Sequence, residues 1–143
     1  MAGLSKKESL IDTGFMFAVL DKEDVKHETC SLAYEREMAM FLPEVVLPEL
    51  AYLVIRSLGY DILTTFLRYV AAGNLLLIST TREDLERASE ILEKYADSKI
   101  DFVDCVIMAI AERLKIERIL TIDRRDFGLL RPRHYDYFEI IPE

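Results

Sequence analysis

The sequence has no tryptophan, two cysteines, two histidines, five glycines and four prolines among its 143 residues. Two cysteines, Cys30 and Cys105, far apart in apolar or helical stretches, do not make a disulfide framework, so both are expected to be reduced and partly buried. With few Gly and Pro, 51% hydrophobic and 31% charged residues, the composition excludes collagenous, fibrous and disordered classes. The length predicts one globular domain spanning residues 1–143, with its core at about 8–142.

Long apolar runs are also missing. No stretch of the chain approaches the ~20 apolar residues needed to cross a bilayer. The N-terminal sequence MAGLSKKESLID has no apolar segment of the kind found in signal peptides. We therefore expect a cytoplasmic protein with no membrane segment.

Acidic residues outnumber basic ones by 26 to 18, for a formal charge of −8. Taken alone, this balance argues against a protein that coats nucleic acid. The basic residues, however, concentrate between residues 113 and 133. Arg124 and Arg125 in this segment are candidates to hold substrate phosphates; the alternative is that they are solvated or paired with Asp126 and Glu139. The acid-rich amphipathic helix expected over 82–97 is most simply a solvated face.

Short apolar segments alternate with helical patterns of ten to fifteen residues, which predicts a parallel sheet with helices on both faces. The fold class is therefore α/β, a three-layer α/β/α sandwich. The expected strands cover residues 10–12, 41–47, 75–79, 118–122 and 138–141. In sheets of this kind, functional sites form beyond the carboxyl ends of the strands.

Acidic residues recur at those positions. Asp12 ends the first strand, Glu49 follows the second within the first turn of a helix, and Asp123 ends the strand RILTI. Asp104 lies in the first turn of a helix, 102–114, that is apolar almost all round. Each acid alone is explained as a helix cap or as a partner of the helix dipole. One α/β topology, however, would bring all four to the same edge of the sheet.

Carboxylates that close repel one another unless a cation neutralises them. Hard oxygen ligands without Cys or His favour Mg²⁺ or Mn²⁺ over Zn²⁺ or copper. A water activated by such an ion can hydrolyse a phosphodiester. No sequence feature pairs His27 with His134 for acid–base catalysis, and Cys105 in a buried helix is not expected to be reactive.

Four segments resemble the signature blocks of PIN-domain ribonucleases, in particular VapC-type toxins. They read LIDTGFMFAVLD, VVLPELAYLVIRSLG, KIDFVDCVIMAIAERL and RILTIDRRDFGLLRP. The resemblance implies Mg²⁺- or Mn²⁺-dependent endoribonuclease activity on RNA and an acidic tetrad of Asp12, Glu49, Asp104 and Asp123. It also implies that Asp12, Asp104 and Asp123 bind metal, while Glu49 is a further ligand or a base.

Other residues near these blocks receive secondary interpretations. Asp101 is expected to cap its helix, and Asp126 to be a peripheral acid. Thr13 and Thr121 flank the acids and are candidates to orient a metal-bound water, with strand packing or capping as the alternative.

The resemblance further implies a homodimer held inactive by a VapB-type antitoxin. Two alternatives stay open: a PIN nuclease of RNA maturation or decay without an antitoxin, and a non-catalytic metal-binding α/β signalling module.

Overall fold

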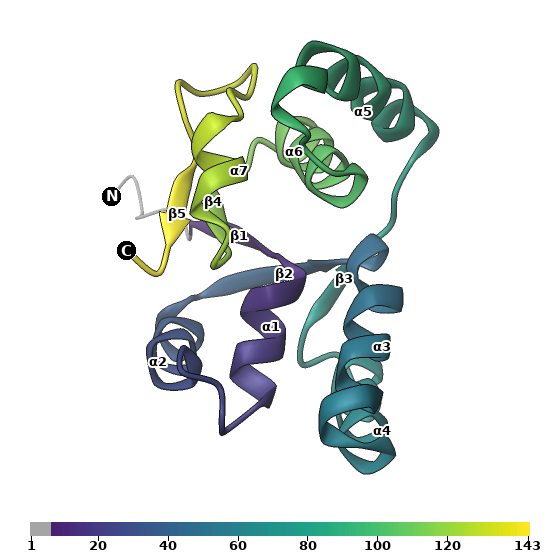
Figure 1. Ribbon diagram of the computed structural model, residues 1–143, viewed down its shortest axis with the longest axis vertical. Helices are drawn as coiled ribbons and strands as arrows, with labels where there is room; N and C mark the ends of the chain where they lie inside the picture. Colours follow the sequence, from purple (N-terminus) through teal and green to yellow (C-terminus); the bar gives the residue numbers. More distant parts are fainter. Residues whose placement is uncertain (1–6) are drawn as a thin grey trace, which may run out of the picture.

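A computed structural model describes residues 7–143, so residues 1–6, part of the stretch used above to judge a signal peptide, lie outside the described residues. Five strands form one parallel sheet in the order β3-β2-β1-β4-β5. β1 lies at its centre, hydrogen-bonded to both β2 and β4 (Figure 1). The strands are β1 Glu8–Ile11, β2 Ala39–Pro43, β3 Leu76–Ile78, β4 Arg118–Leu120 and β5 Glu139–Ile141.

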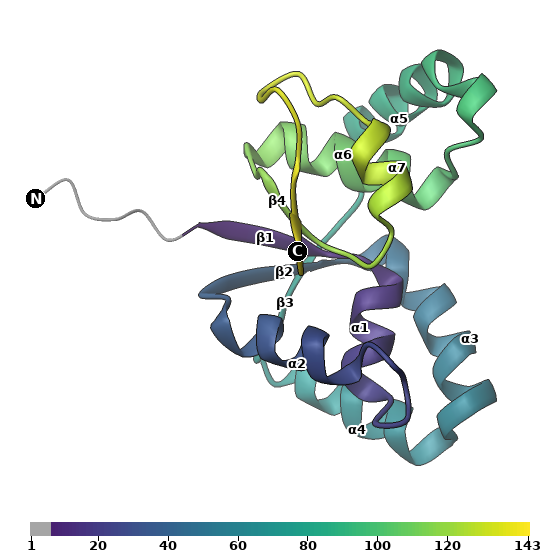
Figure 2. The same ribbon diagram turned by 60° about the vertical axis from the view of Figure 1, so that its left-hand side comes forward.

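Helices cover both faces of the sheet. Helices α1 to α4 lie on one face and α5 to α7 on the other, as two views show (Figures 1 and 2). The predicted three-layer α/β/α class is confirmed. The helices are α1 Thr13–Leu20, α2 His27–Arg36, α3 Leu47–Leu58, α4 Tyr60–Ala71, α5 Arg82–Lys94, α6 Phe102–Leu114 and α7 Arg124–Leu129, with short 3₁₀ turns η1 Glu44–Val46 and η2 Ala96–Ser98.

The order of the strands explains this division. Crossovers between parallel strands are right-handed. The connections from β1 to β2 and from β2 to β3 advance toward one end of the sheet, so their helices fall on one face. Those from β3 to β4 and from β4 to β5 advance the other way, so their helices fall on the opposite face. The direction in which successive strands are added across the sheet therefore reverses between β1 and β4. In α/β proteins, binding sites form at such a point.

Helix α6 is the most buried helix, as its apolar sequence predicts. Eight of its residues, from Asp104 to Ala111, are buried, and Asp104 is the one charged side chain among them. The helix begins after Asp101, whose Oδ1 accepts a 2.8 Å hydrogen bond from the backbone N–H of Asp104. The prediction that Asp101 caps this helix is confirmed.

One expectation about secondary structure was wrong. The apolar run 41–47 does not continue as a strand, because after Pro43 the chain turns through η1 into α3. Val46 is fully buried within that turn, so the apolar pattern reflects burial rather than extended structure. The six-residue helix α7 was not foreseen.

The cysteines Cys30 and Cys105 are reduced, as expected, and both are buried. Burial raises the pKa of the Cys105 thiol to about 12. Among residues 7–143, no helix has both the length and the apolar character needed to cross a membrane.

Candidate metal centre

The carboxyl ends of the parallel strands β1 and β4 lie side by side at the point where the order of strand addition reverses. Register pairs Ile11 with Leu120, and the backbone N–H of the next residue, Asp12, donates a 2.9 Å hydrogen bond to the Leu120 carbonyl. Asp12 caps α1 just beyond β1, and Thr121 and Asp123 follow β4. The two strand ends thus place their polar side chains next to each other.

A buried hydroxyl connects the acids of these two strand ends. Thr121, which is 0% exposed, donates a 2.8 Å hydrogen bond from Oγ1 to Oδ2 of Asp12. Oγ1 of Thr121 also accepts a 2.9 Å hydrogen bond from the backbone N–H of Asp123. Oδ1 of Asp12 accepts from the N–H of Thr13 at 2.8 Å. The carboxylate of Asp12 is therefore held at both oxygens.

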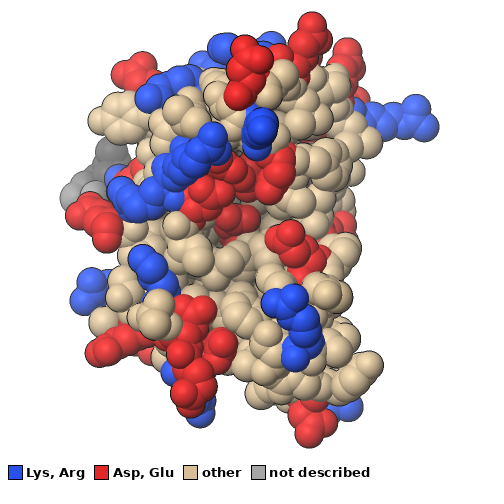
Figure 3. All heavy atoms as spheres, viewed as in Figure 1, with Lys and Arg blue, Asp and Glu red and all other residues tan. Residues whose placement is uncertain are grey.

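Asp123 also belongs to a close group of three carboxylates. Oxygen atoms of Asp104, Asp123 and Asp126 all lie within 4.8 Å of one another. Asp104 comes from the first turn of α6, Asp123 is the N-cap of α7, and Asp126 lies in the first turn of α7. Oδ1 of Asp123 accepts a 3.0 Å hydrogen bond from the N–H of Asp126, which fixes the start of this short helix. Figure 3 shows acidic side chains collected in a hollow between the two helical layers.

The pKa values of Asp12, Asp104 and Asp123 are raised, and a bound cation would lower them again. Burial, and next the charge of Asp12, raise the pKa of Asp104 to about 10. Burial also raises the pKa of Asp12 to about 6, against the lowering effect of its bond to Thr121. The pKa of Asp123 is raised too, chiefly by burial. Without a cation, part of this cluster must hold protons at neutral pH.

The cluster fits a divalent cation. Oδ2 of Asp104 is buried and has no hydrogen-bond partner among the described residues, an arrangement that costs free energy unless something else binds it. The available donors are carboxylate oxygens, which are the ligands that Mg²⁺ and Mn²⁺ prefer. Geometry and donor chemistry thus fit a divalent cation.

Glu49, the fourth acid of the expected tetrad, is not in the group whose oxygens lie within 4.8 Å of one another. It occupies the first turn of α3 and is exposed to solvent. Thr13 sits beside Asp12 with its Oγ1 buried and unpaired within the described part of the chain. Of the four acids expected to share an edge, the structure brings Asp104 and Asp123 within 4.8 Å of each other. It places Asp12 beside Asp123 through Thr121.

Asp126 is the acid whose position the sequence did not reveal. It is 9% exposed and belongs to the close group rather than to its periphery, so that expectation was wrong. The available signal was the spacing of Asp123 and Asp126: an acid three residues after an N-cap lies in the first turn of a helix.

The two candidate phosphate-binding arginines have partners within the protein. Nη1 of Arg124 donates to the carbonyl oxygen of Pro142 at 2.8 Å. Arg125 donates from Nη1 to Oδ1 of Asp126 and from Nη2 to the Ser98 carbonyl at 2.8 Å. The alternative that Arg125 pairs with Asp126 is therefore what the structure contains.

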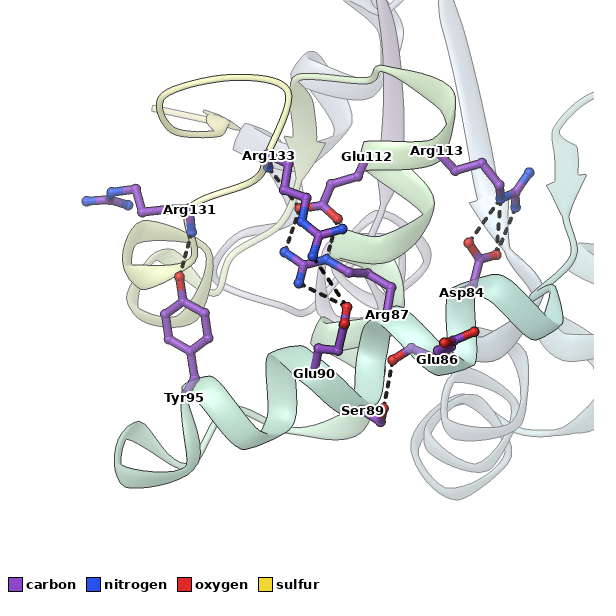
Figure 4. A network of polar contacts seen from close by, with 10 residues as sticks. All are labelled: Asp84, Glu86, Arg87, Ser89, Glu90, Tyr95, Glu112, Arg113, Arg131 and Arg133. Atoms are coloured by element: carbon purple, nitrogen blue, oxygen red, sulfur yellow. Dashed lines mark hydrogen bonds and ion pairs between the residues drawn. The ribbon is translucent and has the colours of Figure 1, made fainter.

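The rest of the basic segment is also largely engaged in ion pairs. Arg113 binds Asp84, and Arg118 binds Glu37 and Glu139. Arg133 joins Arg87, Glu90 and Glu112 in a network that fastens α5 to α6 and to the chain beyond α7 (Figure 4). Helix α5, expected to be a solvated face, is thus one side of a structural ion-pair network.

Fold and cluster together define an α/β protein with an acidic centre suited to divalent cations. The chain belongs to the PIN-domain family, whose model, described as "PIN domain", matches residues 9–130. It is 33% identical over 134 residues to Ribonuclease VapC26 of Mycobacterium tuberculosis (strain ATCC 25618 / H37Rv), an alignment covering 93% of this chain and 99% of that one. The resemblance to VapC-type members is confirmed.

Solved structures show the same fold at lower sequence identity. The crystal structure of Mycobacterium tuberculosis VapC20, a Sarcin-Ricin loop cleaving toxin, matches with a TM-score of 0.72 and 20% identity, covering 78% of this chain and 86% of that chain. VapBC2 from Rickettsia felis, bound to a DNA fragment from their promoter, matches with a TM-score of 0.67 and 14% identity, covering 93% and 98%. These likenesses concern the fold.

Proposed function

We propose that this PIN-domain protein is a divalent-metal-dependent endoribonuclease and the toxin of a type II toxin–antitoxin pair. One observation carries the metal-dependent chemistry: Asp104 has a buried, unpartnered carboxylate oxygen within 4.8 Å of oxygens of Asp123 and Asp126. The relative at 33% identity, a ribonuclease by name, supports RNA as the substrate.

In this proposal Asp104, Asp123 and Asp126 hold a Mg²⁺ or Mn²⁺ ion and Asp12 lies next to it as a further ligand. When bound, such an ion lowers the pKa of water and stabilises charge on a phosphodiester under attack. The chain's own contribution is orientation: Thr121 and the N–H of Thr13 hold the Asp12 carboxylate, and the α7 cap holds Asp123. In the proposal Glu49, an exposed residue in the first turn of α3, is a further ligand or the base that positions water.

Contact with RNA is assigned to the exposed rim around the acids. Arg124 follows Asp123 directly, is exposed, and engages a single backbone carbonyl through Nη1. It can exchange that carbonyl for a phosphate oxygen, and such contacts weaken as salt rises. Thr13 is a candidate for a polar contact deeper in the site because its hydroxyl is unpaired.

The proposed partners are a VapB-type antitoxin and a second copy of the chain, in the cytoplasm. Structures of toxin–antitoxin complexes from Klebsiella pneumoniae and Salmonella typhimurium, with TM-scores of 0.66 and 0.67, support the first. Exposed apolar side chains on α3 and α4 support an interface: Tyr52 is 62%, Tyr60 72% and Leu67 45% exposed.

The test is RNA cleavage by the pure protein with and without Mn²⁺, beside Asp104→Asn, which keeps the shape of the side chain but removes its charge. Cleavage that needs Mn²⁺, stops with EDTA and is lost in Asp104→Asn is the expected result. Full cleavage by Asp104→Asn would refute the assignment. Phosphorylation by a small phosphodonor without nuclease activity would indicate a signalling module instead. Co-expression with the product of an adjacent small reading frame tests the antitoxin.

A further inference from the structure

Arg125 bridges the two parts of the chain that carry the clustered acids. Its Nη1 donates to the carboxylate of Asp126 on α7, and its Nη2 donates to the carbonyl of Ser98 at 2.8 Å. Ser98 ends η2, three residues before Asp101, which caps α6. One guanidinium therefore joins the start of α7 to the turn that leads into the helix of Asp104.

The distance between those two parts sets how close the carboxylate oxygens of the cluster lie. Asp104 comes from one part, whereas Asp123 and Asp126 come from the other. Carboxylates within 4.8 Å repel one another when they are ionised, as ligands of a cation must be, and this repulsion acts to separate the two parts. A bond that spans them opposes this separation and keeps the oxygens at a distance suited to a shared ion.

A second hydrogen bond joins the same two parts without touching an acid. The backbone N–H of Arg131, beyond α7, donates to Oη of Tyr95 at 3.1 Å, just before η2. It provides a matched comparison: both bonds tie the end of the α5–η2 segment to the α7 region, but only Arg125 also orients a carboxylate of the cluster.

We propose that Arg125 is a positioning residue that raises the affinity of the acidic cluster for a divalent cation by fixing Asp126 relative to α6. The proposal rests on the proposed function, since it concerns the same centre. Groups that orient metal ligands typically change metal affinity by about 10- to 100-fold when they are removed. The guanidinium also carries a like charge toward the cation, but 63% of its side chain is exposed, so solvent and salt screen that repulsion.

This role differs from the phosphate contact expected from the sequence. A phosphate-binding arginine acts on RNA affinity and leaves the metal affinity of the free protein unchanged. A positioning arginine acts on metal affinity in the absence of RNA, and its loss is overcome by raising the metal concentration. The two roles therefore separate in a binding measurement made without substrate.

The experiment measures the Kd for Mn²⁺ by electron paramagnetic resonance of the free ion, using the full chain, Arg125→Gln, Arg125→Lys and Tyr95→Phe. We expect the Kd to rise about tenfold in Arg125→Gln, to rise less in Arg125→Lys, which keeps the charge and one bond, and to stay within about twofold in Tyr95→Phe. An unchanged or tighter Kd in both Arg125 variants overturns the proposal. An equal loss in Tyr95→Phe also overturns it, because loosening of the segment would then explain the effect.

RNA cleavage gives the second measurement. In Arg125→Gln, saturating Mn²⁺ should restore kcat, and KM for RNA should stay within about twofold of the unsubstituted protein. A raised KM with unchanged Mn²⁺ affinity would assign Arg125 to the substrate and overturn the proposal. If the unsubstituted protein binds Mn²⁺ but cleaves no RNA, the proposed function fails while the comparison of Kd values still decides the role of Arg125.

Discussion

The hydroxyl of Thr121 donates a 2.8 Å hydrogen bond to Asp12 while it accepts a 2.9 Å bond from the backbone N–H of Asp123. One fully buried oxygen thus fixes a carboxylate that follows β1 and the turn that carries a carboxylate after β4. With its proton directed at Asp12, this hydroxyl orients a carboxylate of the candidate centre. Thr121 belongs to the framework of the centre.

Replacing Thr121 with valine should therefore weaken both folding and activity. The change keeps the shape of the side chain but leaves the buried Oδ2 of Asp12 and the partly buried Asp123 N–H without partners, which costs about 1–3 kcal/mol. Urea unfolding should report that loss, and RNA cleavage at saturating Mn²⁺ should fall. Thr121→Ser, which keeps the hydroxyl, is the control and should retain most of both. Equal behaviour of the two variants would contradict this role.

The sequence predicted the sheet and three of the acids near its edge because each rests on a local pattern. Asp12 ends an apolar strand, Asp104 interrupts an apolar helix, and Asp123 ends another strand. Alternating strands and helices then required right-handed crossovers and a parallel sheet, in which the carboxyl ends of the strands share one edge. The strand order that sets β1 beside β4 comes from the structure.

What the sequence did not predict depends on side-chain placement over short segments. Helix α7 has six residues, fewer than two turns, so its apolar residues show no repeating helical pattern and Asp126 was not recognised as a neighbour of Asp123. The arginines of residues 113–133 looked like a basic surface in one dimension. Their acidic partners, such as Asp84 and Glu37, come from distant parts of the chain, and no local pattern encodes those pairs.

The metal-free protein should lose stability as pH rises. Folding raises the pKa of Asp104 from 3.8 to about 10 and that of Asp12 from 3.8 to about 6. Between the unfolded and the folded pKa, the folded state holds a proton that the unfolded state has released. The free energy of unfolding therefore falls as pH rises through this range, and the fall ends above the folded pKa. Each linked proton changes the free energy of unfolding by at most about 1.4 kcal/mol per pH unit.

Thermal unfolding in EDTA at about pH 5.5 and pH 8.5 tests this dependence, since paired carboxylates such as Asp84 stay ionised across that window. The Tm should be lower at the higher pH, and Asp104→Asn should flatten the difference and raise the Tm at pH 8.5. Mn²⁺ competes with protons for the same oxygens, so the Tm gain from Mn²⁺ should grow with pH. A Tm that rises with pH in EDTA would show that Asp104 is ionised in the metal-free fold.

Asp126 should matter to metal binding as much as Asp123 does. Its carboxylate lies in the close group of three, so Asp126→Asn removes a charge from the ion's immediate surroundings. Loss of such an interaction should raise the Kd for Mn²⁺ about tenfold or more. Titration calorimetry on Asp126→Asn and Asp123→Asn measures this directly, with the exposed acid Glu83→Gln as the control. Unaltered affinity in Asp126→Asn would return this residue to the periphery.

Glu49 should contribute little to binding of the ion by the free protein. It is exposed on α3 and lies outside the group whose oxygens are within 4.8 Å. Glu49→Gln is expected to keep the Kd for Mn²⁺ within about twofold, whereas Asp104→Asn loses measurable binding. A drop in RNA cleavage with unchanged Mn²⁺ affinity would identify Glu49 as a base. A Kd raised as far as in Asp123→Asn would instead make it a ligand, as the tetrad implied.

The ion pair between Asp84 and Arg113 should support folding without supporting catalysis. Asp84 is 2% exposed, accepts hydrogen bonds from Nε and Nη2 of Arg113 at 3.0 and 2.9 Å, and accepts another from the N–H of Thr81 at 3.0 Å. Burial acts to raise the pKa of Asp84, but the bonds from Arg113 and Thr81 outweigh it and hold that pKa below its usual value.

Asp84→Asn should therefore destabilise the fold by about 1–3 kcal/mol, since it weakens the cap of α5 and leaves the guanidinium of Arg113 without its counter-ion. Because a lowered pKa contributes stability above its unfolded value, the difference from the unsubstituted protein should be full at neutral pH and shrink as pH falls below about 4. Urea unfolding at neutral pH and below about pH 4 measures this difference in stability. The exposed-residue variant Glu83→Gln is the control. Mn²⁺ affinity and cleavage well below the Tm should be unchanged, and their loss would mean that the network positions α6 for the acidic centre.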